Sequence, residues 1–174
     1  SLKTEVLVSE MAKIAFILLC HKDPDAIIKQ ATRLTAAGDC MAIHFDARAR
    51  NEHFVRLREA LKDNPNIVFA KKRIKCGWGQ WSLVQATLRA VQAAEAAFSR
   101  VTHCFMLSGD CMAIKSSQFA HDFLDQDDVD YIETMDFFQS DWIKTGMKDE
   151  RLIFRHPFNE RTQKRLFYAS LNLQ

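Results

Sequence analysis

Short apolar runs alternate with amphipathic segments along the first 134 residues of the chain. Residues 13–20 (KIAFILLC) are apolar after the initial lysine, which is typical of a strand buried on both faces of a sheet. Runs of the same kind predict four further strands, at residues 40–45, 67–70, 103–107 and 130–134.

The segments between these runs have the spacing and the end signals of helices. Asp23 and Pro24 are a cap residue and a first-turn proline, so they predict a helix start, and Gly38 predicts its end. Further helices are predicted at residues 50–62, 80–98 and 116–124. In the alanine-rich helix at 80–98, the side chains expected to face the core are Val84, Leu88, Val91 and Ala94 or Glu95.

Strands that alternate with helices at this spacing imply a parallel sheet wrapped by helices. We therefore predict an α/β fold, with a mostly parallel sheet of about five strands and helices on both faces. This domain is placed at residues 13–134. Residues 1–12 are interpreted as an N-terminal extension or in part a cloning scar, and residues 135–174 as a separate, truncated part.

Composition narrows the class of protein. The formal net charge is +2, so no strong field favours binding to nucleic acid or to a membrane surface. The longest apolar stretch, residues 14–20, is too short to cross a bilayer, and the chain does not start with a secretory leader. Five scattered cysteines lack zinc-site spacing, and we interpret Cys20, Cys40 and Cys104 as reduced core residues of a cytoplasmic protein.

Candidate chemistry lies where the predicted strands end, because ligands of open α/β sheets bind beyond the carboxyl ends of the strands. The loops at these ends contain Asp46, Arg48, Trp78 and Asp110. A carboxylate can accept hydrogen bonds from a base or ribose, an arginine can bind phosphate oxygens, and a tryptophan offers a flat apolar face. The set fits a nucleotide diphosphate-sugar, although strand-end polar residues also serve as caps and turn formers.

Other nucleotide-binding and hydrolase sites are excluded because the chain lacks their sequence motifs. No GxGxxG follows residues 13–20, and the chain contains no GxxxxGK[ST]. The turn at Ser108 lacks the second glycine of a nucleophile elbow.

Four segments in this order have a family resemblance. They are IAFILLCHKDP at 14–24, IHFDAR at 43–48, CGWGQWSLVQATL at 76–88 and FMLSGDCMAIKS at 105–116. Together they resemble the core-2/I-branching β-1,6-N-acetylglucosaminyltransferase family, which also contains the peptide O-xylosyltransferases. The resemblance covers about residues 13–134, the nucleotide-sugar-binding half of such an enzyme.

This resemblance implies a GT-A-like fold and an inverting transfer of N-acetylglucosamine or xylose from a UDP donor, such as UDP-GlcNAc, to a hydroxyl-bearing glycan or other acceptor. It implies no cofactor and no metal, and no DxD follows the fourth predicted strand. The positions that match the donor site are Cys20, His21, Asp46, Arg48, Trp78, Gly79, Ser108, Gly109 and Asp110. Among them, Asp46 and Arg48 are expected at the uridine and the phosphate region, and Trp78 at the sugar.

The resemblance also implies what the chain lacks. Its catalytic base is expected beyond Gln174, so residues 135–174 would begin the acceptor and catalytic half, and the chain would be a fragment of a bacterial cytoplasmic enzyme of membrane-glycan or polysaccharide synthesis. Three positions depart from the family pattern: Phe45 stands where valine is usual, Gln80 replaces a glycine, and Asp110 stands one position early in a turn that lacks the usual proline. The alternative is therefore a non-catalytic α/β nucleotide-binding or interaction module with a degenerate site.

Overall fold

The computed structural model describes residues 13–126, 129–132, 134, 136, 139, 157–159 and 162–171. The chain divides into two compact units, Ser1–Val129 and Asp130–Gln174. The proposed extension at 1–12 lies outside the described residues, as does most of the segment 135–174. In the second unit, helix α6 (Lys164–Leu171) buries Phe167, whose ring centroid lies 5.4 Å from that of Tyr168.

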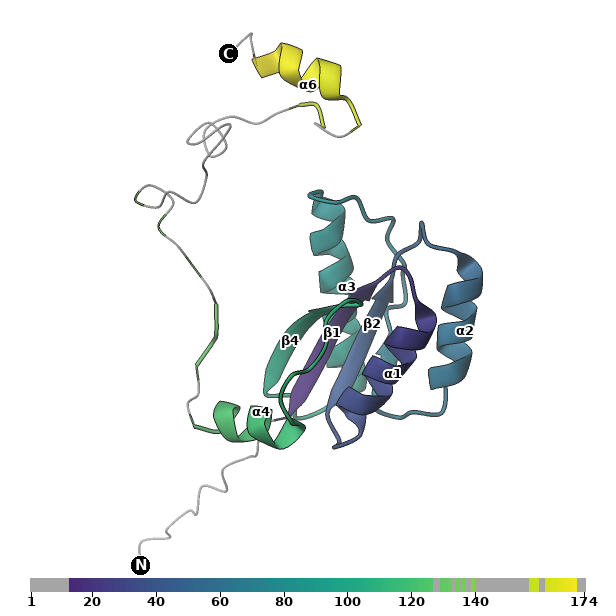
Figure 1. Ribbon diagram of the computed structural model, residues 1–174, viewed down its shortest axis with the longest axis vertical. Coiled ribbons are helices and arrows are strands. Elements are labelled where there is room, and N and C mark those ends of the chain that lie inside the picture. The colour runs from purple at the N-terminus through teal and green to yellow at the C-terminus, as the bar shows by residue number, and fades with distance from the viewer. Residues whose placement is uncertain are drawn as a thin grey trace, which may run out of the picture. The chain divides into compact units, whose positions relative to one another are not determined.

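The described part of the first unit alternates strands and helices (Figure 1). Its strands are β1 (Ile14–Cys20), β2 (Cys40–Phe45), β3 (Ile67–Phe69) and β4 (His103–Ser108). Its helices are α1 (Pro24–Thr35), α2 (Asn51–Leu61), α3 (Trp81–Ala97) and α4 (Ser117–Leu124).

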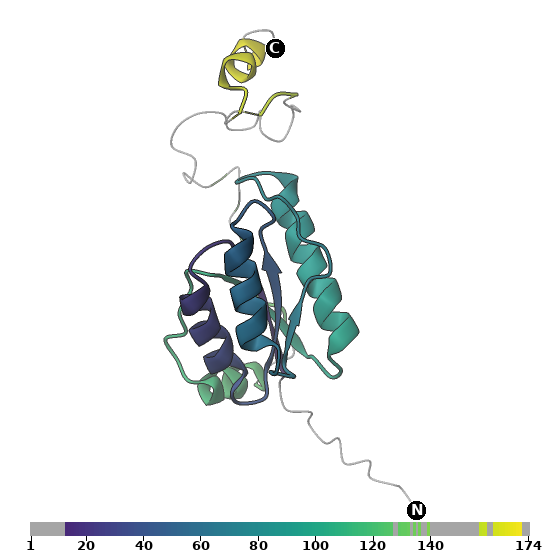
Figure 2. The same ribbon diagram turned by 90° about the vertical axis from the view of Figure 1, so that its right-hand side faces the viewer.

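The four strands form a parallel sheet in the order β3-β2-β1-β4. In the centre of the sheet, Leu18 of β1 is paired with Ile43 of β2 on one side and with Leu107 of β4 on the other. Helices α1 and α2 cover one face, and α3 covers the opposite face (Figure 2). The predicted fold class, a parallel α/β fold with helices on both faces, is confirmed.

Strand β1 is buried on both faces, as its unbroken apolar run predicts. On one face, Phe16 and Leu18 belong to a cluster with Ile27 of α1 and Leu57 of α2. On the other face, Ile17 belongs to a second cluster with the alanines of α3. The central strand thus connects two separate cores.

The prediction of the buried face of α3 was right for Ala94, which is buried, and for Val91, which packs on the core, but wrong for Val84, Leu88 and Glu95. Val84 and Leu88 are 42% and 49% exposed, and Glu95 is exposed as well. The buried residues are Ala86, Ala90, Ala93 and Ala94. The sheet residues beneath them include Ala15 and Ala42, and two surfaces of small side chains pack closely without space for Val84 or Leu88. Favouring large apolar side chains therefore placed the first half of the buried face wrongly, at Val84 and Leu88 instead of Ala86 and Ala90.

Strand β4 is the edge strand of the described sheet, and it is exposed along most of its length. Phe105 and Met106 are 55% and 51% exposed. All five cysteines are free, and Cys20 and Cys40 are buried as predicted. Cys104 is exposed, contrary to its interpretation as a core residue, because it lies on this edge.

The fifth strand predicted at 130–134 is not formed by the residues that the structure describes there, 130–132 and 134. Topology gives the physical reason. Helix α4 packs through Ala120 and Leu124 on the same face as α1 and α2. A parallel strand at the free edge of β4, reached across that face, would need a left-handed crossover, which is very rare.

A buried carboxylate attaches α4 to the amino-terminal end of the sheet. Asp39, which is 2% exposed, precedes β2. Its oxygens accept the Ile14 N–H at 3.0 Å and the Ser117 hydroxyl at 3.3 Å, and His121 Nε2 lies 2.8 Å from Oδ2. One side chain therefore satisfies the buried Ile14 N–H of β1 and also bonds two partly exposed side chains of α4.

We predict that Asp39→Ala destabilises the first unit by about 2–3 kcal/mol, because it leaves the Ile14 N–H and His121 without an acceptor. Urea unfolding followed by far-UV circular dichroism measures this change. The control is Asp63→Ala at an exposed turn, which should stay within about 0.5 kcal/mol of the parent. Equal stability of the two variants would contradict the anchoring of α4 by Asp39.

Candidate functional site

The ends of the strands bring several of the predicted donor residues together. The Asp46 N–H donates to Cys20 O at 2.9 Å, and the Gly109 N–H donates to Leu19 O at 3.1 Å. These bonds place the residues that follow β1, β2 and β4 side by side at the carboxyl edge of the sheet. The loop over residues 70–80 joins the same edge, because the Ala70 N–H donates to Ile43 O at 2.9 Å.

Asp46 holds two loops with one carboxylate oxygen. Its Oδ1 accepts the Arg48 N–H at 2.7 Å and the Cys76 N–H at 3.2 Å. The first bond is the turn-forming use of aspartate that its sequence position allowed. Among the described residues, Oδ2 has no hydrogen-bond partner, so the half-buried carboxylate keeps one acceptor for a ligand.

His44 fixes the loop over residues 70–80 from below. It is 1% exposed, and its Nε2 accepts the Ile74 N–H at 2.8 Å, while Ile74 O accepts the Ala47 N–H at 3.0 Å. Burial lowers the pKa of His44 by disfavouring the charged ring. The accepting Nε2 carries no proton, so the neutral ring holds its proton on Nδ1.

Arg73 is a site residue that sequence reasoning missed. Its Nε and Nη2 donate to the carbonyl oxygens of Phe45 and Asp46 at 3.1 and 2.9 Å. Its Nη1 donates to Asn51 Oδ1 at 3.0 Å, and the guanidinium lies 4.2 Å from the ring centroid of Phe54. The sequence offered one indication: Ile74 is a single apolar residue inside a basic loop. Such a residue indicates that the loop packs on the body of the protein instead of extending into solvent.

Trp78 and Gly79 lie in the turn before α3. Trp78 is 73% exposed, so it is not a core residue. Gly79 has φ 68°, a conformation that favours glycine. The Gly77 N–H donates to Ser82 Oγ at 2.9 Å, which fixes this turn to the first residues of α3. The indole is thus presented outward from an anchored turn.

The turn after β4 contains the remaining candidates. The Cys111 N–H donates to Ser108 O at 3.1 Å, and Gln30 of α1 donates to Cys111 O at 2.7 Å. A methyl group on Gly109 would lie 3.2 Å from Cys20 Cβ, so only glycine fits without a shift. The exposed Asp110 carboxylate is paired with Lys22 Nζ at 3.2 Å.

The other predicted side chains differ in what they can contribute. Burial raises the pKa of Cys20 to about 12, so its thiol stays protonated at neutral pH, and its carbonyl oxygen accepts the Asp46 N–H. His21 and Arg48 are exposed at the same edge. The arrangement therefore offers an acceptor at Asp46, a cation at Arg48 and an exposed indole.

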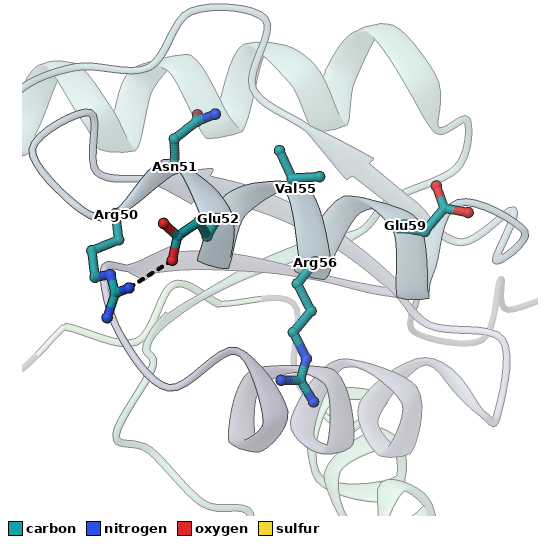
Figure 3. A pocket seen from close by; sticks show the side chains of 6 residues that line it. All are labelled: Arg50, Asn51, Glu52, Val55, Arg56 and Glu59. Carbon is teal, nitrogen blue, oxygen red and sulfur yellow. Dashed lines mark hydrogen bonds and ion pairs between the residues drawn. The ribbon is translucent and has the colours of Figure 1, made fainter.

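One hollow of the described surface is lined by Arg50 and by residues of α2. It has a volume of about 620 Å³ and runs along the outer side of α2 (Figure 3). Its charged side chains already form pairs: Arg50 lies 2.6 Å from Glu52, and Arg56 lies 2.6 Å from Asp25. Among the described residues, no three His, Cys, Asp or Glu side chains gather as metal ligands, and no helix has the length and apolar character to cross a bilayer.

Comparison with known proteins gives one family. The sequence model of the family described as Core-2/I-Branching enzyme matches residues 14–172 of this chain. No curated protein matches the chain significantly. The family match includes β1, the loop over residues 70–80 and the turn after β4, which are the parts that form the carboxyl edge described above.

We predict that acid weakens the fold through His44. The pKa of this residue is lowered from 6.5 in the folded chain, so its stabilising effect is complete above pH 6.5 and is lost as the pH falls below it. Urea midpoints at pH 7 and pH 5 measure the loss. In His44→Gln, an amide oxygen replaces the acceptor without titrating, and the loss should be smaller. The same pH dependence in both proteins would contradict the assignment.

Proposed function

The chain belongs to the Core-2/I-branching enzyme family of glycosyltransferases, and on that premise we propose that it takes part in the inverting transfer of N-acetylglucosamine or xylose from a UDP donor to a hydroxyl acceptor. The first unit binds the nucleotide-sugar at the carboxyl edge of the sheet. We propose a β-1,6-N-acetylglucosaminyltransferase-like reaction, because the four sequence segments resemble enzymes of that type.

One observation carries the proposal: Asp46 is held in place by hydrogen bonds within the protein. Its Oδ1 is bonded to the amides of Arg48 and Cys76, while Oδ2 is left with no bonded partner among the described residues. A carboxylate oriented in this way can accept hydrogen bonds from a base or ribose without a further loss of side-chain freedom. Trp78 and Gly79, the positions expected at the donor sugar, lie in the same loop as Cys76.

The proposed reaction needs two kinds of charge. A carboxylate base deprotonates the acceptor hydroxyl, the oxygen attacks the anomeric carbon, and the bond to the UDP oxygen breaks. The negative charge that develops on the diphosphate is stabilised by cationic side chains in place of a metal. Arg48 supplies one such cation, and the base belongs to the part of the family pattern expected after Gln174.

A cytoplasmic location and a role in membrane-glycan or polysaccharide synthesis belong to the same proposal. They agree with the absence of disulfides at Cys20 and Cys40, which are free and buried. The acceptor is a glycan or another hydroxyl-bearing molecule, and no nucleic acid is expected as a partner at a net charge of +2.

The second candidate function is a non-catalytic module that keeps the fold and has lost the site. The observation that favours it is the turn after β4, where Asp110 is paired with Lys22 at 3.2 Å. In this candidate, the carboxylate does not meet the donor. The two functions differ in whether the carboxyl edge binds UDP.

We predict that Asp46→Asn weakens binding of UDP-GlcNAc or UDP-xylose about tenfold or more, with little change in the melting temperature. The amide oxygen can still accept the two loop N–H groups, whereas the charge and the second acceptor are lost. Isothermal calorimetry measures the affinity, with Asp63→Asn as the matched control. Absence of heat from UDP and from both sugar nucleotides with the parent protein would exclude the donor site and favour the second function.

We further predict that donor binding does not require a divalent cation. The affinity for UDP-GlcNAc should be the same, within a factor of about two, in EDTA and in added Mn²⁺ or Mg²⁺, because cationic side chains act at the diphosphate. Calorimetry in buffer with EDTA and in buffer with the divalent cation makes the comparison. Binding that appears only with metal would refute this part of the proposal.

A further inference from the structure

The carboxylate of Asp46 can serve a ligand only if the main chain that carries it stays in place. Asp46 directly follows the last residue of β2, where the ladder of the sheet has ended. Its N–H is bonded to Cys20 O, and its Oδ1 is bonded to two amides. Its own carbonyl oxygen and that of Phe45 are bonded to a single side chain, that of Arg73.

We propose that Arg73 is a positioning residue that sets the affinity for the nucleotide through Asp46. The inference rests on the proposed donor site and adds a residue that does not touch the ligand. The Nη2 atom of Arg73 donates to the carbonyl oxygen of Asp46 at 2.9 Å and so holds the main chain that carries the carboxylate. It also lies three residues before Cys76, whose amide holds the carboxylate itself.

The surroundings of Arg73 explain how it can fix a main-chain position. Its three nitrogens each have an acceptor, at 3.1, 2.9 and 3.0 Å, so the guanidinium plane is determined. The plane lies over Phe54, with 4.2 Å from the guanidinium carbon to the ring centroid, and Phe45 lies 5.5 Å away. Asn51, the third acceptor, is the first residue of α2 and is labelled in Figure 3. Arg73 thus joins the end of β2, the start of α2 and its own loop.

Lysine cannot replace this geometry. A guanidinium donates several hydrogen bonds in one plane and stacks on an aromatic ring, whereas an ammonium is a compact point charge. In Arg73→Lys, the charge is kept, but the two carbonyl oxygens and Asn51 cannot all be reached together. The peptide at Asp46 then gains freedom, and the carboxylate loses its fixed direction.

Arg58 provides a matched control. It stacks on the same ring, with 5.8 Å to the centroid of Phe54 and 6.0 Å to that of Phe69, and it lines the same small hollow as Arg73. Among the described residues it makes no hydrogen bond to the end of β2. Arg58→Lys therefore removes a stacked guanidinium at constant charge without affecting Asp46.

The experiment measures the UDP affinity of the whole chain by calorimetry, and its fold by circular dichroism and thermal melting. We expect Arg73→Lys to weaken UDP binding about fivefold or more, and Arg58→Lys to leave it unchanged. The decisive readout is a double-mutant cycle with Asp46→Asn. If Arg73 acts through Asp46, then Arg73→Lys causes little further loss in the Asp46→Asn background. An equal loss in both backgrounds would show an effect independent of Asp46 and overturn the inference.

Asn51→Ala extends the test to a variant that keeps Arg73. It removes one of the three acceptors at an exposed position, so the fold should be preserved. A two- to threefold loss of UDP affinity, on the order of one weakened neutral hydrogen bond, is expected. Parent-like affinity of folded Arg73→Lys, or of Asn51→Ala where Arg73→Lys does not fold, would refute the positioning role. Failure of the parent protein to bind UDP would instead refute the proposed function.

Discussion

The polar groups at the end of β2 lose their strand partners before the chain leaves the sheet. Strand β3 ends at Phe69, so the ladder on that side of β2 stops early. The loop over residues 70–80 replaces it: Ala70 N–H donates to Ile43 O, Ala47 N–H donates to Ile74 O, and His44 Nε2 accepts the Ile74 N–H. Backbone groups near a core need partners, and here the need for partners determines where the loop lies.

The same requirement connects the fold to the candidate site. Because the loop is held on β2 by Ile74, the Cys76 amide reaches Asp46 Oδ1, and the turn with Trp78 follows at the same edge. Asp46 is therefore both a turn former and an oriented acceptor, and the two interpretations of its position do not compete. One oxygen bonds the loop, and the other has no hydrogen-bond partner among the residues that the structure describes.

The sequence predicted what depends on local pattern and on general topology. The unbroken apolar run of β1 indicated a central strand, and the rule for strand ends led to Asp46 before any side-chain position was known. It could not predict the buried face of α3, since that depends on how small Ala15 and Ala42 make the opposing surface. Nor could it predict Arg73, whose three acceptors come from Phe45, Asp46 and Asn51, at least 22 residues away in the chain.

The turn after β4 decides how much its departure from the family pattern matters. Gly109 packs against Cys20, and Gln30 holds Cys111 O, so the register of the turn is fixed and Asp110 is directed to Lys22. Both partners of this ion pair are more than half exposed, and such pairs contribute about 1 kcal/mol or less. In the proposed function, the donor's diphosphate carries more charge than one carboxylate and would compete for Lys22 at little cost. The Asp110–Lys22 pair therefore carries little weight in favour of the non-catalytic module.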